Sequence, residues 1–142
     1  MKNILIGITL TVCPVMVSGQ DAARAVDLFE AGMYKAAQKH FLKHPSAESY
    51  YYLGEIAFAL QQSDSAAYYY ELGLTDAAPY LLCFVGQGKL SLANNAKAAE
   101  EYFQKAFPNK AAKKNPAIYT AIGRAYAANK MGDKAMEYFA QA

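Results

Sequence analysis

A helical hairpin that occurs twice in nearly the same form is the feature that most limits how this sequence can fold. In residues 117–142, apolar side chains recur at helical spacing on both sides of a break at residues 130–133, which predicts two short helices packed together. Residues 50–74 repeat this pattern. In both copies a glycine of the first helix precedes an alanine of the second by 12 residues, and an aromatic residue follows that alanine by four. Helix backbones can approach closely at the small residues, and the aromatic rings fill the space beside them.

The second helix of this hairpin recurs twice more, so its aromatic residue appears as Phe41, Tyr70, Phe103 and Phe139, at steps of 29, 33 and 36 residues. Repetition at this period predicts a stacked array in which each unit buries its apolar face on its neighbour. The residues expected to carry the packing are Leu53, Gly54, Ala66, Tyr70, Ala99, Phe103, Tyr119, Gly123, Tyr126, Ala135 and Phe139.

These residues resemble the tetratricopeptide repeat, a unit of about 34 residues with an aromatic, Leu-Gly, Tyr, Ala, aromatic, Ala skeleton. The resemblance implies an all-α fold, a solenoid of about four helical hairpins of which the first and third are degenerate. In the third hairpin Gly86 and Gly88 compete for the family's glycine position, and neither lies 12 residues before Ala99. The array is expected to cover residues 20–142, with hairpins at about 21–44, 46–74, 77–107 and 116–142.

The first 19 residues have the pattern of a secretory signal peptide. Lys2 precedes an apolar run at residues 4–17, and small residues follow, which predicts cleavage after Gly19. An uncleaved anchor is the alternative, but the run is shorter than the roughly 20 residues that a membrane-spanning helix needs. Cys13 leaves lipidation as a third alternative, although the residue before it is not small as that motif requires. We therefore expect an exported bacterial protein of the periplasm or the outer membrane.

Charge and cysteine content exclude several classes of protein. Removal of residues 1–19 takes away one lysine and leaves 13 basic and 12 acidic side chains, which is not the charge balance of a nucleic-acid-binding protein. Cys83 is then the only cysteine, so no intramolecular disulfide can form and stability must come from packing. Within the apolar segment 81–85 we expect Cys83 to be a small buried residue, with a reactive thiol as the alternative.

No constellation of residues predicts catalysis, a metal site or a cofactor site. His40 and His44 share a helix face, but no third ligand is spaced to join them. Residues 86–88 resemble the start of a dinucleotide-binding loop, yet no strand precedes them and no third glycine follows at the right place. Glu100 and Glu101 are adjacent on a helix and point to different faces. We therefore expect a protein that is not an enzyme and that needs no cofactor.

Two segments do not fit a compact array. The connection at residues 108–116 carries three lysines between two prolines and is longer than stacking requires, so we expect a solvated linker, with a contact site for an acidic partner as the alternative. No polar helix follows the last hairpin, although terminal repeats need capping. Its apolar face is expected to be covered by a continuation of the chain past Ala142 or by a second molecule.

The resemblance implies that a protein or peptide partner binds the concave surface formed by the first helices of the hairpins. Positions just after each glycine and one turn to either side are the expected contacts. These positions are Glu48, Tyr51, Glu55, Phe58, Lys89, Leu92, Thr120 and Arg124. Glu55 and Arg124 are expected to be solvated there, whereas Tyr51 and Phe58 have packing between hairpins as an alternative role.

Three functions from different classes agree with these observations. The first is an exported scaffold or adaptor that mediates protein–protein interaction at the bacterial cell envelope through its concave face. The second is an N-terminal structural module of a longer envelope protein whose active domain follows residue 142. The third is a glycan-binding module, suggested by the 12 tyrosines and by the amides of Gln61 and Gln62. None of the three requires nucleic acid or a metal ion.

Overall fold

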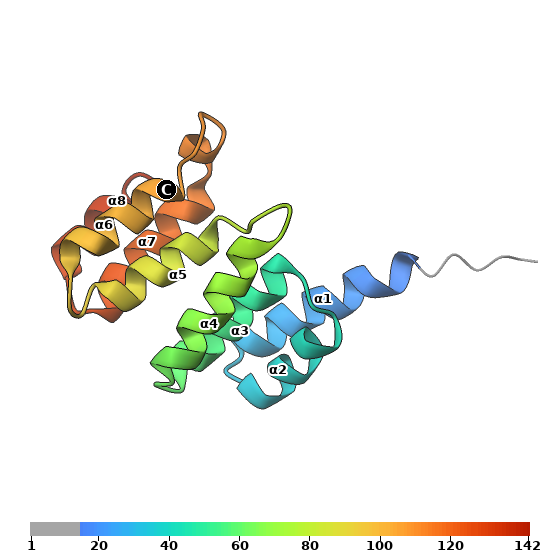
Figure 1. Cartoon of the computed structure of the whole chain (residues 1–142). Helices are drawn as coiled ribbons and strands as arrows, with labels where there is room; N and C mark the ends of the chain where they lie inside the picture. The colour runs from blue at the N-terminus through green and yellow to red at the C-terminus, as the bar shows by residue number, and fades with distance from the viewer. Residues whose placement is uncertain (1–14) are drawn as a thin grey trace, which may run out of the picture.

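The computed structural model describes residues 15–142, which form eight α-helices and one 3₁₀ turn (Figure 1). The elements are α1 (Val15–Glu30), α2 (Tyr34–Lys43), α3 (Ala47–Ala59), α4 (Ser63–Thr75), α5 (Leu82–Ser91), α6 (Ala96–Lys105), η1 (Ala112–Lys114), α7 (Pro116–Ala128) and α8 (Gly132–Phe139). The helices pair in chain order into four hairpins, and the described residues contain no strand. The predicted all-α solenoid of helical hairpins is confirmed.

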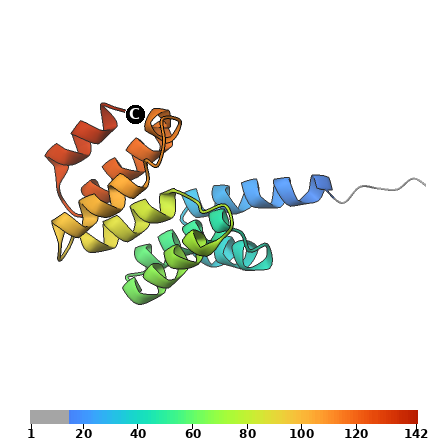
Figure 2. The same ribbon diagram turned by 45° about the horizontal axis from the view of Figure 1, so that its top comes forward.

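The first helices of the four hairpins form one layer. Helix α3 contacts both α1 and α5, and α5 contacts α7. Figure 2 shows the hairpins following one another along the array. Because equivalent positions of α1, α3, α5 and α7 face the same way, side chains distant in the sequence are brought to one surface.

Three of the four hairpins turn in the same way. Gly32, Gln61 and Lys130 follow the first helix with positive φ angles of 72°, 60° and 61°, the left-handed conformation that commonly ends a helix. In the turn between α3 and α4, the N–H groups of Gln61 and the next residue donate back to two carbonyl oxygens of α3, both at 2.9 Å. The turns of the second and fourth hairpins therefore use residues whose Cβ atom disfavours this conformation.

Side-chain caps fix the start of three helices. Ser46, Asn95 and Asn115 each accept a hydrogen bond of 3.0 Å from a backbone N–H in the first turn of α3, α6 and α7, respectively. These short polar side chains satisfy N–H groups that have no partner inside the helix. The sequence thus specifies where three of the helices begin.

Aromatic rings pack directly on glycines, and this packing settles the register of the third hairpin. The ring of Tyr70 is fully buried between Gly54 of its own hairpin and Gly86 of the next, because a Cβ atom at either glycine would lie 2.4 Å from its Cε1. A Cβ atom at Gly88 would lie equally close to the ring of Phe103, within the third hairpin. Gly88 is therefore the equivalent of Gly54, and Gly86 belongs to the interface between hairpins.

Most of the predicted packing residues are buried. The buried set is Leu53, Gly54, Ala66, Tyr70, Ala99, Phe103, Gly123, Tyr126 and Ala135. Tyr119 is partly buried and packs on Phe107, with ring centroids 5.0 Å apart. Phe139 packs on Gly123 but is 40% exposed, and Met136 beside it is 70% exposed, so α8 presents an apolar face.

The connection at residues 108–116 is more ordered than the predicted solvated linker. Ala112, within η1, is only 6% exposed and belongs to the same hydrophobic cluster as α6 and α7 residues. The hydroxyl of Tyr119 donates a hydrogen bond of 3.0 Å to the carbonyl oxygen of Lys113. The three lysines of the connection are exposed, so their side chains are solvated while the backbone is anchored on α7.

The predicted signal peptide lies mostly outside the described residues, as does Cys13. Of residues 1–19, only 15–19 are described, and they form the beginning of α1. Among the described helices, none is long and apolar enough to cross a membrane.

Candidate functional site

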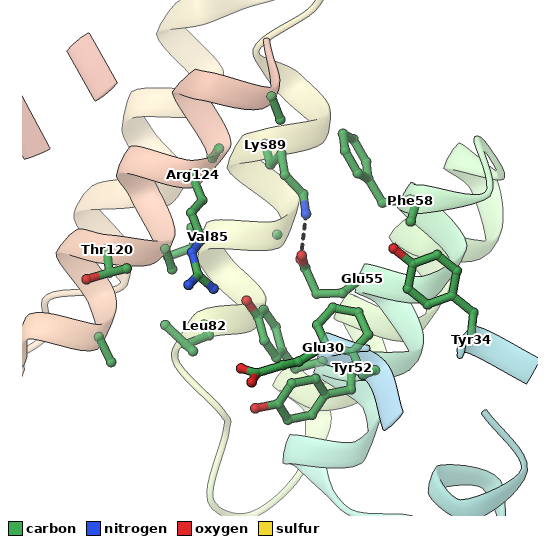
Figure 3. A pocket seen from close by; sticks show the side chains of 18 residues that line it. Glu30, Tyr34, Tyr52, Glu55, Phe58, Leu82, Val85, Lys89, Thr120 and Arg124 are labelled. Carbon is green, nitrogen blue, oxygen red and sulfur yellow. Dashed lines mark hydrogen bonds and ion pairs between the residues drawn. The ribbon is translucent and has the colours of Figure 1, made fainter. Parts of the chain in front are cut away.

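A groove of about 460 Å³ opens along the layer of α1, α3, α5 and α7 (Figure 3). All four hairpins contribute to it, since each first helix presents residues at helical spacing to the same side. Its lining consists of Phe29, Glu30, Tyr34, Tyr51, Tyr52, Glu55, Phe58, Ala59, Leu82, Val85, Gly86, Lys89, Ala117, Thr120, Ala121, Arg124, Ala125 and Ala128.

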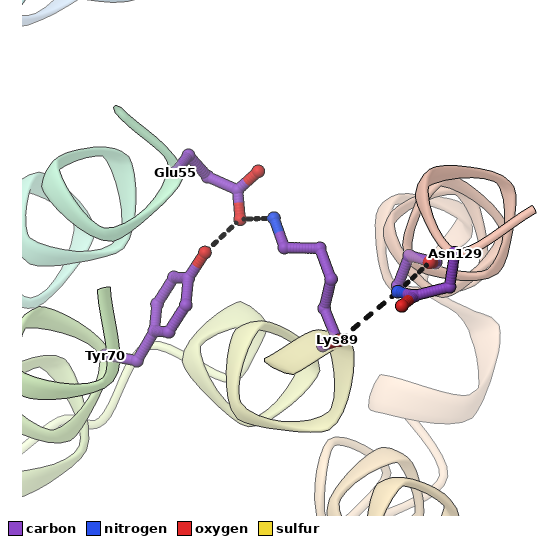
Figure 4. A network of polar contacts seen from close by, with 5 residues as sticks. Glu55, Tyr70, Lys89 and Asn129 are labelled. Carbon is purple, nitrogen blue, oxygen red and sulfur yellow. Dashed lines mark hydrogen bonds and ion pairs between the residues drawn. The ribbon is translucent and has the colours of Figure 1, made fainter. Parts of the chain in front are cut away.

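A buried polar network lies in the groove between the second and third hairpins (Figure 4). Oε1 of Glu55 accepts hydrogen bonds from the Tyr70 hydroxyl at 2.6 Å and from Lys89 Nζ at 2.5 Å. The backbone oxygen of Lys89 accepts a hydrogen bond of 3.3 Å from Nδ2 of Asn129, at the end of α7. The network therefore connects three hairpins.

The ammonium group of Lys89 is held among aromatic rings as well as by a carboxylate. Its Nζ lies 4.1 Å from the ring centroid of Phe58 and 5.8 Å from that of Tyr70, within the range of cation–π attraction. Burial lowers the pKa of Lys89, and the carboxylate of Glu55 opposes this by favouring the charged form. Burial, followed by the Glu55 carboxylate, raises the pKa of Tyr70 well above its usual value, so its hydroxyl stays a donor.

Tyrosines of α3 form one wall of the groove. Tyr52 stacks on Phe41, with ring centroids 5.0 Å apart and an angle of 2° between the planes. Tyr51 packs against Tyr52, Tyr70 and Tyr80 at centroid distances of 5.3, 6.2 and 5.5 Å. Burial raises the pKa of both Tyr51 and Tyr52, and nearby carboxylates add to the rise. The wall is thus a neutral surface that can donate and accept hydrogen bonds.

Two charged side chains of the groove are open to solvent. Glu30 ends α1 and Arg124 lies on α7; both are exposed, and neither forms an ion pair with another described residue. Arg124 points into the groove from the wall opposite α3 (Figure 3). The charge of Glu30 raises the pKa of Tyr52 and that of Arg124 lowers it, although burial is the largest cause of the shift. Both charges therefore act on the same stretch of the groove.

The structure places six of the eight predicted binding residues on the groove and two elsewhere. The six are Tyr51, Glu55, Phe58, Lys89, Thr120 and Arg124. The prediction for Leu92 was wrong, because α5 ends at Ser91 and the side chain of Leu92 is buried in the core, 8% exposed. Glu48 is exposed on the first turn of α3, close to Tyr80 and outside the groove lining. The expectation that Glu55 is solvated was also wrong, because its side chain is only 20% exposed beside Lys89.

Sequence reasoning missed Glu30 and Tyr52 as groove residues. Glu30 belongs to a first helix without the Leu-Gly signature, so no register located it. Tyr52 lies within three consecutive tyrosines, and only the phase of α3 decides which of them faces the groove. The helical phase set by the buried Leu53 and Gly54 was the signal that could have found Tyr52.

The described residues offer little support for a chemical centre elsewhere. No group of three His, Cys, Asp or Glu side chains among them could hold a metal ion. His40 and His44 line a second hollow of about 420 Å³, where Nε2 of His44 lies 3.8 Å from Oδ2 of Asp21. Cys83 is fully buried, and burial raises the pKa of its thiol to about 12.

Comparison with known proteins supports the fold. No protein-family model and no curated protein matches the sequence. Among solved structures, the crystal structure of MamA superposes with a TM-score of 0.56 at 21% identity, over 87% of this chain and 75% of MamA. A second crystal structure of MamA gives a TM-score of 0.55 at 21% identity, over 87% of this chain and 70% of that one. The fold is tetratricopeptide-like. Tetratricopeptide-like arrays generally mediate protein–protein interaction through extended concave surfaces.

Proposed function

We propose that this protein is an exported scaffold that binds an extended segment of a partner protein in its groove, at the bacterial cell envelope. The observation that carries the proposal is the groove itself, which spans all four hairpins and combines an aromatic wall with open charges. An extended peptide can place alternate side chains against such a surface while its backbone bonds to tyrosine hydroxyls. Tyr and Arg are also the residues that most often anchor a bound protein.

A glycan is a weaker candidate for the groove. Sugars stack on open aromatic faces, but here Lys89 covers Phe58 and Phe41 covers one face of Tyr52. Gln61 and Gln62 lie in the turn between α3 and α4 and are not among the groove residues. We also propose a binding role without catalysis, because Glu55 and Lys89 are paired with each other and the sequence contains no recognisable catalytic motif.

Site-specific photo-cross-linking in the native cell tests the binding proposal. A benzophenone amino acid replaces Thr120 in the groove, and the control replaces Tyr68, which is 58% exposed on α4 and outside the groove. We expect Thr120 to capture a defined partner that Tyr68 does not capture. Ala121→Trp, which fills the groove, should abolish the capture, whereas Ala127→Trp on the exposed side of α7 should preserve it. Equal capture at Thr120 and Tyr68 would contradict the proposal.

Export and cleavage are tested separately, because binding does not depend on them. Cell fractionation followed by N-terminal sequencing should find a protein beginning at Gln20 outside the cytoplasm. A full-length protein in the cytoplasm would overturn the localisation and leave the groove proposal standing. Recovery of peptides that extend past Ala142 would instead support a role as one module of a longer envelope protein.

A further inference from the structure

The charges of this chain are divided between its two halves. Residues 20–76, the first two hairpins, contain eight acidic and four basic side chains. Residues 77–142, the last two hairpins, contain four acidic and nine basic side chains. The groove runs from the first half to the second, so its two ends lie in fields of opposite sign.

The charged residues that line the groove follow the same division. Glu30 and Glu55 come from α1 and α3, whereas Lys89 and Arg124 come from α5 and α7. Glu55 and Lys89 neutralise each other at 2.5 Å. This leaves Glu30 of α1 and Arg124 of α7 as exposed charges without an ionic partner in the described part of the chain, both near enough to Tyr52 to shift its pKa.

The surface between these two charges is apolar and aromatic. Tyr52 lies on one wall, and Leu82 and Val85 of α5 lie on the floor between α3 and α7 (Figure 3). All three are at least partly buried and none is charged, so they provide an apolar surface for a ligand to pack on. A ligand that pairs with both charges would therefore lie against this uncharged surface as well.

We infer that the groove selects an extended peptide that carries a basic side chain for Glu30, an acidic side chain for Arg124 and apolar side chains that pack on Leu82 and Val85. This inference rests on the proposed function and adds to it the charge pattern of the bound segment. A peptide whose acidic side chain faces Glu30 and whose basic side chain faces Arg124 would be repelled at both positions. Residues 1–14 of the chain cannot be this ligand, because Lys2 is their only charged side chain and they supply no acid for Arg124.

Selection from a peptide display library tests the inference. Random twelve-residue peptides with neutral flanks are selected on the immobilised protein and, in parallel, on Arg124→Glu and on the groove-filling variant Ala121→Trp. Arg124 is exposed, so its replacement should leave the helical circular dichroism unchanged. We expect the selected peptides to carry a Lys or Arg and an Asp or Glu at a fixed separation. Selection on Arg124→Glu should replace the acidic residue by a basic one.

Affinity measurements on one selected peptide then give the size of the effect. Arg124→Glu should weaken binding about fivefold or more, the change expected when an exposed ion pair is lost and a repulsion takes its place. Changing the acidic residue of the peptide to Lys should restore the binding of this variant. Lys110→Glu, the same reversal of charge at an exposed residue outside the groove, is the matched control and should bind as the unchanged protein does.

The outcomes separate this inference from the proposed function. Enrichment that Ala121→Trp abolishes, but that shows no charge pattern, would overturn the inference and leave the peptide groove intact. Failure to enrich any peptide in a groove-dependent way would overturn both. A concentration-dependent dimer that Arg124→Glu or Glu30→Lys dissociates, and that a mixture of the two variants restores, would make a second copy of this chain the occupant and would also overturn the inference.

Discussion

Nζ of Lys89 lies 2.5 Å from Oε1 of Glu55, which ties the third hairpin to the second although the two residues are 34 positions apart. The side chains are 8% and 20% exposed, so the pair is largely removed from water. Removing a charged group from water costs free energy, and here the attraction between the two opposite charges offsets that cost. The pair is therefore part of the interface between hairpins as well as part of the groove.

We predict that the two partners of this pair are unequal in their contribution to stability. Glu55→Gln leaves the Lys89 ammonium group buried without a carboxylate, so the free energy of unfolding should fall by about 2–4 kcal/mol. Lys89→Met keeps an unbranched apolar side chain at this position, and Glu55 keeps its bond from Tyr70, so the loss should be about 1 kcal/mol. Urea unfolding followed by circular dichroism measures both. The double variant should lose less than Glu55→Gln alone, and strictly additive losses would contradict the coupling.

An exposed pair in the same protein provides the matched control. Nζ of Lys134 lies 3.1 Å from Oε1 of Glu100, and Glu100 also accepts a hydrogen bond from the Tyr126 hydroxyl. The side chains of Lys134 and Glu100 are 44% and 38% exposed. Because water screens this pair, Lys134→Met should cost less than about 1 kcal/mol. If Lys134→Met lowered the free energy of unfolding as much as Glu55→Gln does, burial would not be what makes the Glu55–Lys89 pair important for stability.

Local patterns predicted the fold, whereas contacts between hairpins could not be predicted. The spacing of glycine, alanine and aromatic residues reports packing within one hairpin, and the second and fourth hairpins were located from it. The same spacing could not decide between Gly86 and Gly88, because both pack on a ring and the ring of Tyr70 belongs to another hairpin. Lys89 has no neighbour in the sequence that marks it as buried, since its partner lies in the preceding hairpin.

We predict that Gly86→Ala destabilises the protein although alanine is the better helix former. The new Cβ atom would lie 2.4 Å from Cε1 of Tyr70, and the ring cannot move away because Gly54 holds its other side. Overpacking should outweigh the gain in helix propensity of about 1 kcal/mol, for a net loss of about 1–2 kcal/mol. Gly132→Ala is the control, since nothing lies within 4 Å of its Cβ position, and thermal unfolding should show it to be neutral or slightly stabilising. Similar midpoints for the two variants would argue against the close contact.

The free energy of unfolding should fall steeply above pH 10, because buried tyrosines stay protonated in the folded protein and ionise freely in the unfolded chain. Burial, and then the Glu55 carboxylate, raises the pKa of Tyr70, so its hydroxyl stays protonated in the folded protein while it ionises near pH 10 in the unfolded chain. The contribution of Tyr70 is therefore complete below pH 10 and is lost above it, at about 1.4 kcal/mol per pH unit. Tyr70→Phe should be less stable at pH 8 but should lose less stability between pH 10 and 11, as measured by urea midpoints. Tyr68→Phe, at an exposed position, should keep the steep dependence.

Cys83 should resist alkylation as long as the protein is folded. Burial raises the pKa of its thiol to about 12, and the side chain has no exposed area. Since the thiolate is the reactive form, labelling by iodoacetamide at pH 8 should be about a thousandfold slower than in urea. Mass spectrometry of a Cys13→Ser variant isolates this site. Labelling at the same rate with and without urea would place the thiol at the surface and contradict the packing of α5 on α4.

Two turns of the array are strained by their side chains, and glycine should relieve the strain. Gln61 has a φ of 60°, in the position where the first hairpin has Gly32, and its N–H is already bonded to α3. The left-handed conformation costs a residue with a Cβ atom about 1 kcal/mol or more, and glycine does not incur this cost. Gln61→Gly should therefore raise the free energy of unfolding by about 0.5–1 kcal/mol, even though glycine gains flexibility in the unfolded chain. Gln62→Gly is the matched control: its φ is −100°, so the same replacement one residue later brings only the entropic loss and should destabilise the protein.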